Sequence, residues 1–390
     1  MSAQRSLATT SHNIANVNTP GYSRQRVELT TREPQFIGVG YIGKGVNTAA
    51  IERIHNQFLT VQLRTSTSGD SGIKTFHQLV RQMEQILADE QTSLSTSMQQ
   101  FFNAMQDVAD LPSSISARQV MISEAQSLAA RFQFLDDRFS ALGDGVRTQL
   151  DLDISGLNSL ASMIADMNTR IVSSQGGQPS NDLLDQRDQL ILELSELVSV
   201  STVDQGNGAV NVFIGSGQPI VVESTTSTVS ITELYEGHFD LVLTDGTNST
   251  PITDNITGGS IGGLLDFQSQ TLEPMHNSLG RLAIGLADTI NDQHRLGMNL
   301  DGEVNQPFFN VGVPVVLTPG AAPNNVTSAI VDPAVLTDSD YQLVFDGGND
   351  YTLTRLSDNQ TTAIDTGGAS PFTTTAIDGF TLTITAGAAL

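Results

Sequence analysis

One apolar repeat constrains the fold of this chain more than any other feature. From residue 121 to residue 146, an apolar side chain recurs at steps that alternate between four and three residues. Heptad spacing of this kind puts a single stripe along one side of an α-helix, and the stripe needs a second helix to cover it. Six of these positions form what we call the helix-packing seam: Met121, Leu128, Phe132, Leu135, Phe139 and Leu142.

The repeat continues beyond the seam with one irregularity. Its rhythm slips around 143–154 and resumes up to Ile171, which predicts either one stuttered helix or two long helices over 116–174. A continuous helix of that length would reach roughly 85 Å, because each residue adds 1.5 Å. Gly176-Gly177 and Pro179 are expected to end it.

Three other segments show the helical period. Apolar residues recur at steps of three or four over 73–111, with an interruption expected near 89–93 and a stop at Pro112. The same pattern recurs over 181–198 and, after a turn-rich stretch, over 264–290. Amphipathic helices are therefore predicted in all three segments.

The remaining segments favour strands and turns. Short alternating runs rich in glycine precede a helix that is expected near 51–63. An apolar period of two over 210–214 and 239–243 predicts half-buried strands. Residues 341–353 alternate in the same way on both sides of Asp346-Gly347-Gly348-Asn349, which predicts a β-hairpin.

Composition argues against several classes of function. The 390 residues include 42 acidic and 18 basic ones, for a net charge of -24, and this charge repels nucleic-acid backbones and anionic membranes. Cysteine is absent, which excludes disulfides and thiolate sites. No apolar run approaches the ~18 residues needed to span a bilayer. Nucleic-acid and membrane partners are not expected, and the length suggests roughly two to four domains.

Two glycine motifs imitate sites of known chemistry. Gly38-Val39-Gly40-Tyr41-Ile42-Gly43 matches the dinucleotide-binding fingerprint, but Pro34 precedes it and no strand-helix-strand unit surrounds it, so we interpret it as a turn between strands. Gly69-Asp70-Ser71-Gly72 matches the nucleophile turn of trypsin-like proteases. Its helix-rich surroundings do not suit that β-barrel, and we interpret it as a polar turn before a helix that begins at Ile73.

Two acidic clusters could in principle bind a cation. Asp182, Asp185 and Asp188 share one face of a predicted helix. We interpret the first two as charges that favour the helix N-terminus, with Asp182 as its cap. The run from Asn299 to Asn305 suggests a calcium loop, but the EF-hand register puts a glycine and a phenylalanine at ligand positions, so a turn is expected. We predict no catalytic, cofactor-binding or metal-binding residue, and no cofactor.

The N-terminal segment carries the strongest resemblance to a known family. Pro20-Gly21 ends the pattern of the first helix, and the run from Asn13 to Gln25 resembles the stretch that follows the first helix in the bacterial flagellar axial proteins. Two later parts of the chain make it similar to the hook-associated protein 1 family of hook-filament junction proteins. These parts are Asn181 to Asp188 with Gln218 to Val222, and Asn291 to His294 with Gly297, Asp301-Gly302 and Phe308-Phe309.

This resemblance implies a fold class and a structural role. The expected fold is an α+β multidomain one, an elongated rod of long α-helices with inserted β-rich outer domains. The expected function is a structural subunit of the hook-filament junction, needed for filament attachment and assembly, and not an enzyme. An assembly motif is expected to fix the bend between the innermost helix and the rod: Asn13, Asn16, Thr19, Pro20, Gly21 and Tyr22.

The resemblance also implies domains, partners and a location. We expect a remnant of the inner helix at 1–30, a helical rod at 31–200 plus 260–310, an inserted β domain at 201–259, and a second, truncated β-rich domain at 311–390. Expected partners are further copies of the chain, the hook protein, the second junction protein and an export chaperone that binds a missing C-terminal region. The protein would be secreted by type III export into the flagellum, outside the cell.

Three alternatives stay open at the level of sequence. Another axial protein, either of the hook or of the distal rod, would share the assembly motif. A secreted adhesin could use the Thr-rich β segments to bind a surface. An exported hydrolase could reside in the outer domains, although no convergent set of polar residues indicates a catalytic pocket.

Overall fold

A computed structural model describes residues 1–36, 38–88, 93–174, 180–235, 238–312, 314–318 and 325–385. The chain divides into two compact units. Unit 1 comprises Met1–His77, Thr148–Thr232 and Asp240–Leu265, and unit 2 comprises Gln78–Arg147, Glu233–Phe239 and Asp266–Leu390. Each unit therefore combines segments that lie far apart in the sequence.

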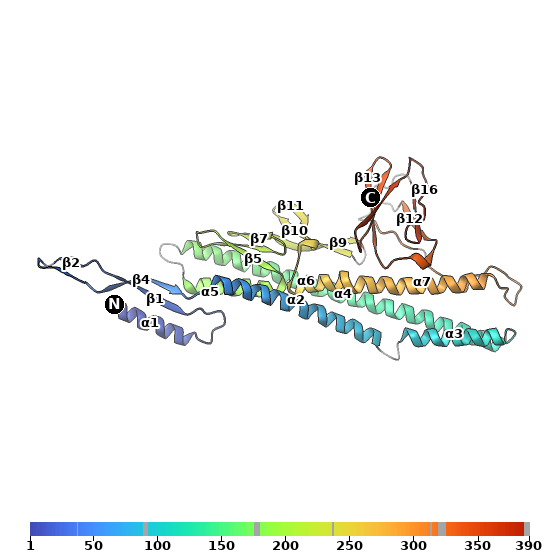
Figure 1. The fold of residues 1–390 in the computed structure, drawn as a ribbon, viewed down its shortest axis with the longest axis horizontal. Helices are drawn as coiled ribbons and strands as arrows, with labels where there is room; N and C mark the ends of the chain where they lie inside the picture. Colours follow the sequence, from blue (N-terminus) through green and yellow to red (C-terminus); the bar gives the residue numbers. More distant parts are fainter. Residues whose placement is uncertain are drawn as a thin grey trace. The chain divides into compact units, whose positions relative to one another are not determined.

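Long α-helices and small β-sheets make up the fold (Figure 1), and the expected α+β multidomain class is confirmed. The α-helices are α1 (Ser2–Ala15), α2 (Gln57–Ala88), α3 (Leu94–Asp110), α4 (Ile115–Ser173), α5 (Asn181–Leu197), α6 (Gly259–Phe267) and α7 (Glu273–Arg295). Short 3-10 turns lie at η2 (Thr253–Asn255) and η4 (Pro333–Val335), and one π-helical turn at η3 (Gln268–Leu272).

The strands form small sheets of two to four members, with sequence neighbours paired in most of them. In unit 1, β1 (Gln25–Thr31) pairs with β4 (Val46–Arg53), β2 (Gln35–Phe36) with β3 (Tyr41–Ile42), and a meander joins β5 (Val200–Asp204), β6 (Val210–Ile214), β7 (Gln218–Val222) and β8 (Thr225–Thr226). A second meander consists of β9 (Thr228–Tyr235), β10 (His238–Asp245) and β11 (Asn248–Pro251). The later sheets are β12 (Val326–Ile330) with β17 (Phe380–Ile384) and β16 (Phe372–Thr373), and β13 (Tyr341–Gly347) with β14 (Asp350–Arg355) and β15 (Gln360–Asp365).

The central apolar repeat forms one helix and not two. Helix α4 runs without a break for 59 residues, from Ile115 to Ser173. The slip in the repeat appears as successive four-residue steps from Leu142 to Ile154, after which the steps of three and four resume. A step of four overshoots the 3.6-residue turn, so the buried stripe drifts around the helix axis while the backbone hydrogen bonds continue. The expected end at Gly176-Gly177 and Pro179 lies outside the described residues.

Helix α2 differs from the prediction in two respects: where it begins and whether a turn interrupts it. The segment 51–53 belongs to strand β4, and the helix begins at Gln57 because the Asn56 side chain accepts the backbone N–H groups of Phe58 and Leu59. The predicted polar turn over 69–72 is wrong as well, since these residues lie inside α2. The predicted run over 73–111 is divided between α2 and α3, and most of its expected break, residues 89–92, lies outside the described residues.

Two glycines explain why the helix continues through that stretch. A Cβ atom on Gly72 of α2 would lie 3.0 Å from the carbonyl oxygen of Gly259, and one on Gly263 of α6 would lie 2.4 Å from the carbonyl oxygen of Gly72. The two backbones thus approach more closely than any side chain allows. The glycines serve helix contact here and not a turn, and α6 begins inside the stretch that reads as turn-rich.

The described β segments of unit 2 include the hairpin that the sequence predicts. In the β13-β14 pair, Leu343 lies opposite Leu353 and Phe345 opposite Tyr351. Strands β12, β14, β15 and β17 supply a core of buried residues: Val326, Tyr351, Leu353, Ile364, Leu382 and Ile384. Successive side chains of a strand point to opposite faces, so every second residue of each strand faces this core.

Candidate functional site

The turn that follows α1 is held by a single asparagine side chain. Asn13 donates from Nδ2 to the carbonyl oxygen of Gln25 (2.9 Å), and its Oδ1 accepts the backbone N–H of Gln25 (2.8 Å). The Tyr22 hydroxyl donates to the same Oδ1 (2.8 Å) and lies 3.0 Å from Nδ1 of His12. The paired bonds reproduce a rung of a β-ladder, so the first residue of β1 is bound directly to the helix.

The rest of the assembly motif closes two tight turns. The Asn16 side chain caps the end of α1 by donating to the carbonyl oxygen of His12 (3.0 Å), and it accepts the Thr19 hydroxyl (3.3 Å). The Tyr22 N–H then donates to the Thr19 carbonyl (3.2 Å), with Pro20 and Gly21 at the two central positions. Gly21 has a φ of +76°, a backbone conformation that the third position of a type II turn requires. The structure thus brings all six motif residues into one local arrangement.

Gly21 also brings the motif against helix α5. A Cβ atom at Gly21 would lie 3.0 Å from Oε1 and 3.3 Å from Cβ of Gln189. A larger residue would therefore need both a strained backbone and displacement of the α5 side chain. This contact connects the first helix to a segment more than 160 residues later in the chain.

The carboxylates of α5 complete the connection. Asp182 lies in the first turn of the helix, as expected, but its predicted role as the cap is wrong, because no side chain among the described residues caps the start of α5, and Asp185 lies beyond the first turn. Asp182 instead accepts Nε2 of Gln25 (3.0 Å), and Asp185 accepts the backbone N–H of Ser23 (2.8 Å). Both contacts lie in the segment that follows the assembly motif, so the acidic face of α5 orients the chain as it enters β1.

Two arginines from the following elements join the same carboxylates. Arg53, at the end of β4, donates from Nη1 to Asp185 (3.0 Å) and to Asp188 (2.6 Å). Arg64 of α2 donates from Nη2 to the other oxygen of Asp188 (3.0 Å). Burial lowers the pKa of Arg64 from its ordinary value, while the carboxylate of Asp188 opposes that change. A buried charge of either sign is tolerated here because each one has a partner.

We call Arg53, Arg64, Asp185 and Asp188 the ion-pair cluster. Sequence reasoning found its two acids but missed both arginines and the contact with Ser23. The spacing of the acids on one helical face was the available signal, because an acidic stripe on a partly buried helix indicates that cationic side chains lie opposite it. The identity of those partners depends on strand pairing and could not be read from local sequence.

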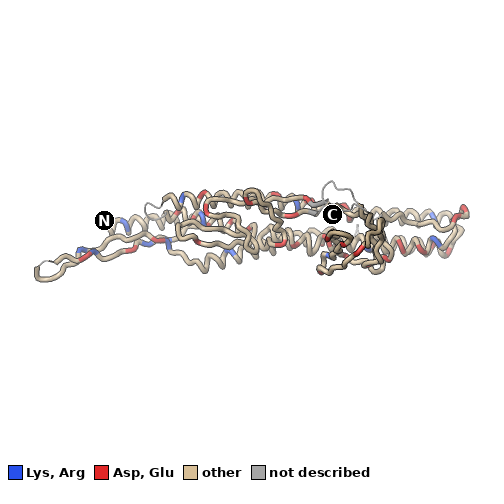
Figure 2. The backbone as a smooth tube through the Cα atoms, turned by 90° about the horizontal axis from the view of Figure 1, so that it is seen from above, with Lys and Arg blue, Asp and Glu red and all other residues tan. Residues whose placement is uncertain are grey.

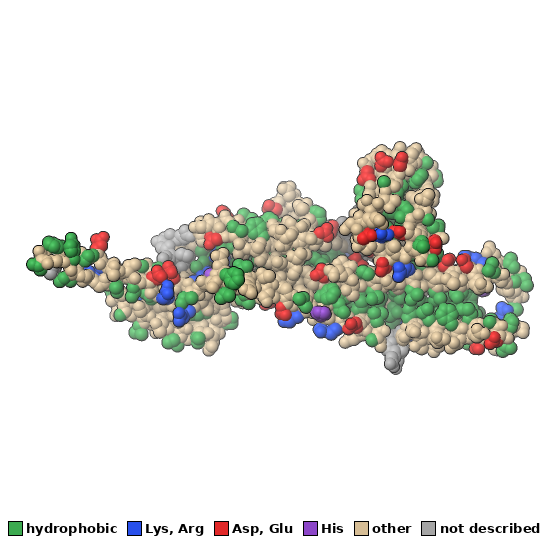
Figure 3. Space-filling view, in the orientation of Figure 1, with side chains coloured by type: hydrophobic (Ala, Val, Ile, Leu, Met, Phe, Trp, Pro, Cys, Tyr) green, Lys and Arg blue, Asp and Glu red, His purple; other side chains and the backbone are tan. Residues whose placement is uncertain are grey.

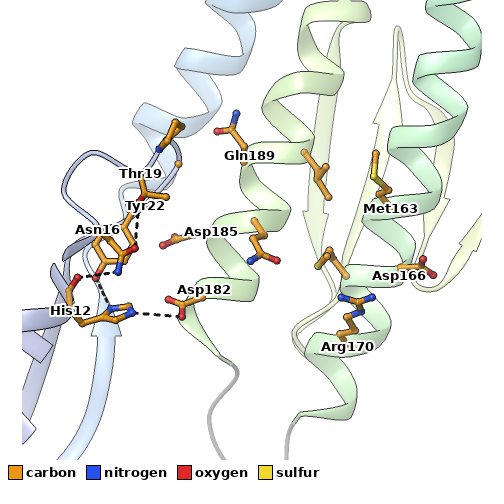
Figure 4. Close-up of a pocket in the computed structure, with 15 residues that line it drawn as sticks. His12, Asn16, Thr19, Tyr22, Met163, Asp166, Arg170, Asp182, Asp185 and Gln189 are labelled. Atoms are coloured by element: carbon orange, nitrogen blue, oxygen red, sulfur yellow. Dashed lines mark hydrogen bonds and ion pairs between the residues drawn. The ribbon is translucent and has the colours of Figure 1, made fainter. Parts of the chain in front are cut away.

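The assembly motif and the two helices α4 and α5 enclose a groove of about 620 Å³ (Figure 4). Its apolar lining comes from Met163, Met167 and Leu190. At its edges, Figure 4 shows His12 and Asp182 on one side and Asp166 and Arg170 on the other. We call this the motif groove. Burial raises the pKa of Tyr22, and the carboxylates of Asp182 and Asp185 raise it further.

A second buried network fixes the meander β5-β8 onto the helices of unit 1. Asn168 of α4 donates to the carbonyl oxygens of Val210 (2.8 Å) and Glu223 (2.7 Å), and accepts Nη1 of Arg187 (3.0 Å). Arg187 also donates to the carbonyl oxygen of Gly208 (2.6 Å). Burial lowers the pKa of Arg187. Polar side chains on α4 and α5 thus define where the sheet begins, which keeps the groove walls in place.

The helix-packing seam lies in unit 2. Leu128 is fully buried with Phe101 of α3, and this cluster includes Met121 and Phe132 of the seam together with residues of α7 and Phe308-Phe309. Leu135 and Phe139 are buried and Leu142 is half-buried. The stripe therefore packs inside the chain against α3 and α7, and any role between subunits stays a prediction.

The imitation motifs do not form sites of the chemistry that they resemble. Gly38 to Gly40 lie between β2 and β3, in agreement with the expected turn between strands, and Tyr41 and Ile42 form β3 itself. Asn299 accepts the N–H groups of Asp301 (3.0 Å) and Glu303 (2.9 Å), so this segment is a turn too. Within the described ranges, no group of three or more His, Asp or Glu side chains could hold a metal ion. Among the same residues, no helix is long and apolar enough to cross a membrane.

Family models match three segments that together make up most of the chain. Residues 80–309 match the model of the flagellar hook-associated protein FlgK helical domain, and residues 319–390 match the D2-like domain of flagellar hook-associated protein 1. Residues 1–22 match the flagella basal body rod protein model. The last of these matches ends at Tyr22, the final residue of the assembly motif.

Curated relatives and a solved structure agree with the family models. The chain is 34% identical to flagellar hook-associated protein 1 of Salmonella typhimurium over 92% of this chain and 66% of that protein. It is 30% identical to the Escherichia coli protein of the same name over 98% of this chain and 71% of that one. The solved flagellar hook junction protein FlgK of Burkholderia pseudomallei superposes with a TM-score of 0.75 at 31% identity, over 83% of this chain and 60% of that chain. The present chain thus spans about two thirds of the length of these relatives.

Proposed function

The chain belongs to the flagellar hook-associated protein 1 family, and from this we propose that it serves as a structural subunit of the bacterial flagellum at the hook-filament junction. It would be needed there for attachment and assembly of the filament. One observation carries the proposal: the segment 80–309 that matches the family's helical domain includes the end of α2 and the whole of α3, α4, α5, α6 and α7. These helices hold the continuous apolar stripe on which the fold depends.

The proposed mechanism is mechanical. The assembly motif would set the direction in which the chain leaves its first helix, and the ion-pair cluster would keep that direction rigid. Buried and paired charges resist bending better than exposed ones, because displacing either partner leaves an uncompensated charge. The domains that we propose at 201–259 and 311–390 would face outward, and the rod at 31–200 plus 260–310 would contact neighbouring subunits.

The proposed partners follow from this position in the flagellum. They are further copies of the chain, the hook protein, the second junction protein, and an export chaperone. Export through the flagellar type III route would place the protein outside the cell. We propose no enzymatic activity, since the named relatives are structural proteins of the flagellum.

Complementation of a strain that lacks its own hook-filament junction protein tests this proposal. The full-length gene should restore attached filaments and swimming, whereas a gene that lacks residues 121–171 should leave hooks without filaments. Electron microscopy of isolated hooks provides the measurement, and immunoblots for export of both proteins provide the control. Full filament attachment by the deletion variant, or failure of the complete gene in spite of export, would contradict the proposal.

A further inference from the structure

Charge is distributed very unevenly along this acidic chain. Residues 1–53 contain six basic and three acidic residues, whereas residues 54–390 contain 12 basic and 39 acidic ones. The first segment comprises α1 and the strands β1 to β4. Figure 2 shows Lys and Arg spaced along the β1-β4 ribbon. A cationic element on a chain of net charge -24 is complementary to the rest of a second copy.

The end of this cationic element is apolar and exposed. In the short β2-β3 hairpin, Val39 is 94% exposed and Tyr41 73% exposed. The rings of Phe36 and Tyr41 contact each other at 5.2 Å between centroids. Figure 3 shows the hydrophobic side chains gathered at this tip. Clustered exposed apolar residues bordered by charge are typical of protein interaction sites.

The tip cannot reach the motif groove of its own copy. Gln25, the first residue of β1, is bound to Asn13 beside the groove. From there β1 extends for seven residues, paired with β4, which carries the chain roughly 20 Å away at about 3.3 Å per residue. A paired ribbon does not fold back on itself, so its tip is available only to another molecule.

The motif groove suits this tip in the chemistry of its lining. Its methionines, Met163 and Met167, are flexible side chains that adapt to inserted aromatic rings. Asp166, on its edge, has no hydrogen bond or ion pair among the described residues, and it is available to a cation such as Lys44. Arg170 on the same edge can lie over the face of an inserted tyrosine ring.

We propose that the β2-β3 hairpin of one copy of this chain docks into the motif groove of a second copy. The contact joins two different surfaces, so it is heterologous and propagates from copy to copy as a ring or a helical layer. The inference rests on the proposed function and adds to it the surface through which adjacent subunits meet. The tip and groove lie at opposite ends of the β1-β4 ribbon, as a propagating contact requires.

Cysteine cross-linking tests the contact, because the chain has no cysteine of its own. Purified Val39→Cys protein is mixed with Met163→Cys protein and oxidised. The matched control uses Leu152→Cys protein in place of Met163→Cys protein, because Leu152 lies on the same helix and is also exposed. We expect a mixed disulfide dimer at roughly tenfold higher yield for the Met163 pair than for the Leu152 pair. Equal yields, absence of the mixed dimer, or dimerisation of Val39→Cys alone would overturn the proposal.

A charge exchange supplies a second measurement that does not depend on cysteine geometry. Lys44→Glu in the Val39→Cys protein should lower the yield several-fold, and Asp166→Lys in the Met163→Cys partner should restore it. Circular dichroism verifies that each variant is folded. A strain that swims normally with Val39→Asp disproves this contact while leaving the junction function intact, whereas failure of the unmodified gene to complement disproves the function itself.

Discussion

Removal of the Asp185 carboxylate tests whether the ion-pair cluster holds the assembly motif in place. Its two oxygens accept the backbone N–H of Ser23 and Nη1 of Arg53. In the Asp185→Ala variant, Ser23 loses its acceptor and Arg53 keeps only Asp188. Asp182→Ala is the matched control, since Asp182 lies one turn earlier on the same helix and also contacts the segment after the motif.

The structure predicts very different magnitudes for the two variants. The side chains of Asp185 and Arg53 are 7% and 14% exposed, so water screens their attraction little. Breaking a buried pair costs about 3–5 kcal/mol, and we expect about 3 kcal/mol because Asp188 continues to neutralise Arg53. The Asp182 side chain is 52% exposed, and loss of its contacts should cost under about 1 kcal/mol.

Hydrogen exchange measured by mass spectrometry reports on this segment directly. Exchange of the backbone amides over 19–25 should accelerate by roughly 100-fold in Asp185→Ala, as about 3 kcal/mol of local stability is lost, and by less than about tenfold in Asp182→Ala. Exchange in the sheet of β13, β14 and β15 should not change in either variant. Equal acceleration by the two variants would refute the assignment of rigidity to the ion-pair cluster.

Three further predictions follow from particular backbone positions and one charge pair. Gly21→Val should abolish filament attachment, because it forces a β-branched residue to a φ of +76°, a strain of about 1–3 kcal/mol. The control Gly246→Val, at a φ of +59° with open space around it, should leave attachment normal. Attached filaments in the Gly21→Val variant would contradict the role of the motif. Gly263→Ala should lower the urea midpoint measured by circular dichroism, because its Cβ would meet the Gly72 carbonyl oxygen at 2.4 Å and overpacking costs about 1–3 kcal/mol. The control Gly69→Ala, with nothing within 4 Å of its Cβ, should raise the free energy of unfolding by about 0.5–1 kcal/mol. A higher free energy of unfolding in both variants would disprove the close helix contact. The Arg355 guanidinium lowers the pKa of Asp358 from 3.8 to about 2, so the stabilisation from this pair is complete above about pH 4 and is lost as pH falls through about 2. Carbon-detected NMR should show the titration midpoint of Asp358 at about 2, and Arg355→Met should move it back toward 3.8. An unchanged midpoint in this variant would exclude Arg355 as the cause.

Local periodicity by itself determined the helices with a regular apolar stripe. Helix α4 and helix α5 lie where the repeat predicts them, and the β13-β14 hairpin turns at Asp346 to Asn349 as expected. In each case the signal is repeated over many residues, so single exceptions do not obscure it. The turn that follows α1 could be predicted for the same reason, because Pro20 and Gly21 restrict the backbone wherever they occur.

Tertiary structure decided what the glycines and charges do. Gly69 and Gly72 favour a turn by only about 1 kcal/mol each relative to alanine, and the approach of α6 to α2 outweighs that preference. The sequence favoured a helix-terminal role for Asp182 and Asp185, whereas the structure pairs Asp185 and Asp188 with Arg53 of β4. Strand pairing and helix packing decide which side chain lies opposite another that is about 130 residues away in the sequence. These contacts form between distant segments, so the local residue pattern of neither segment indicates them.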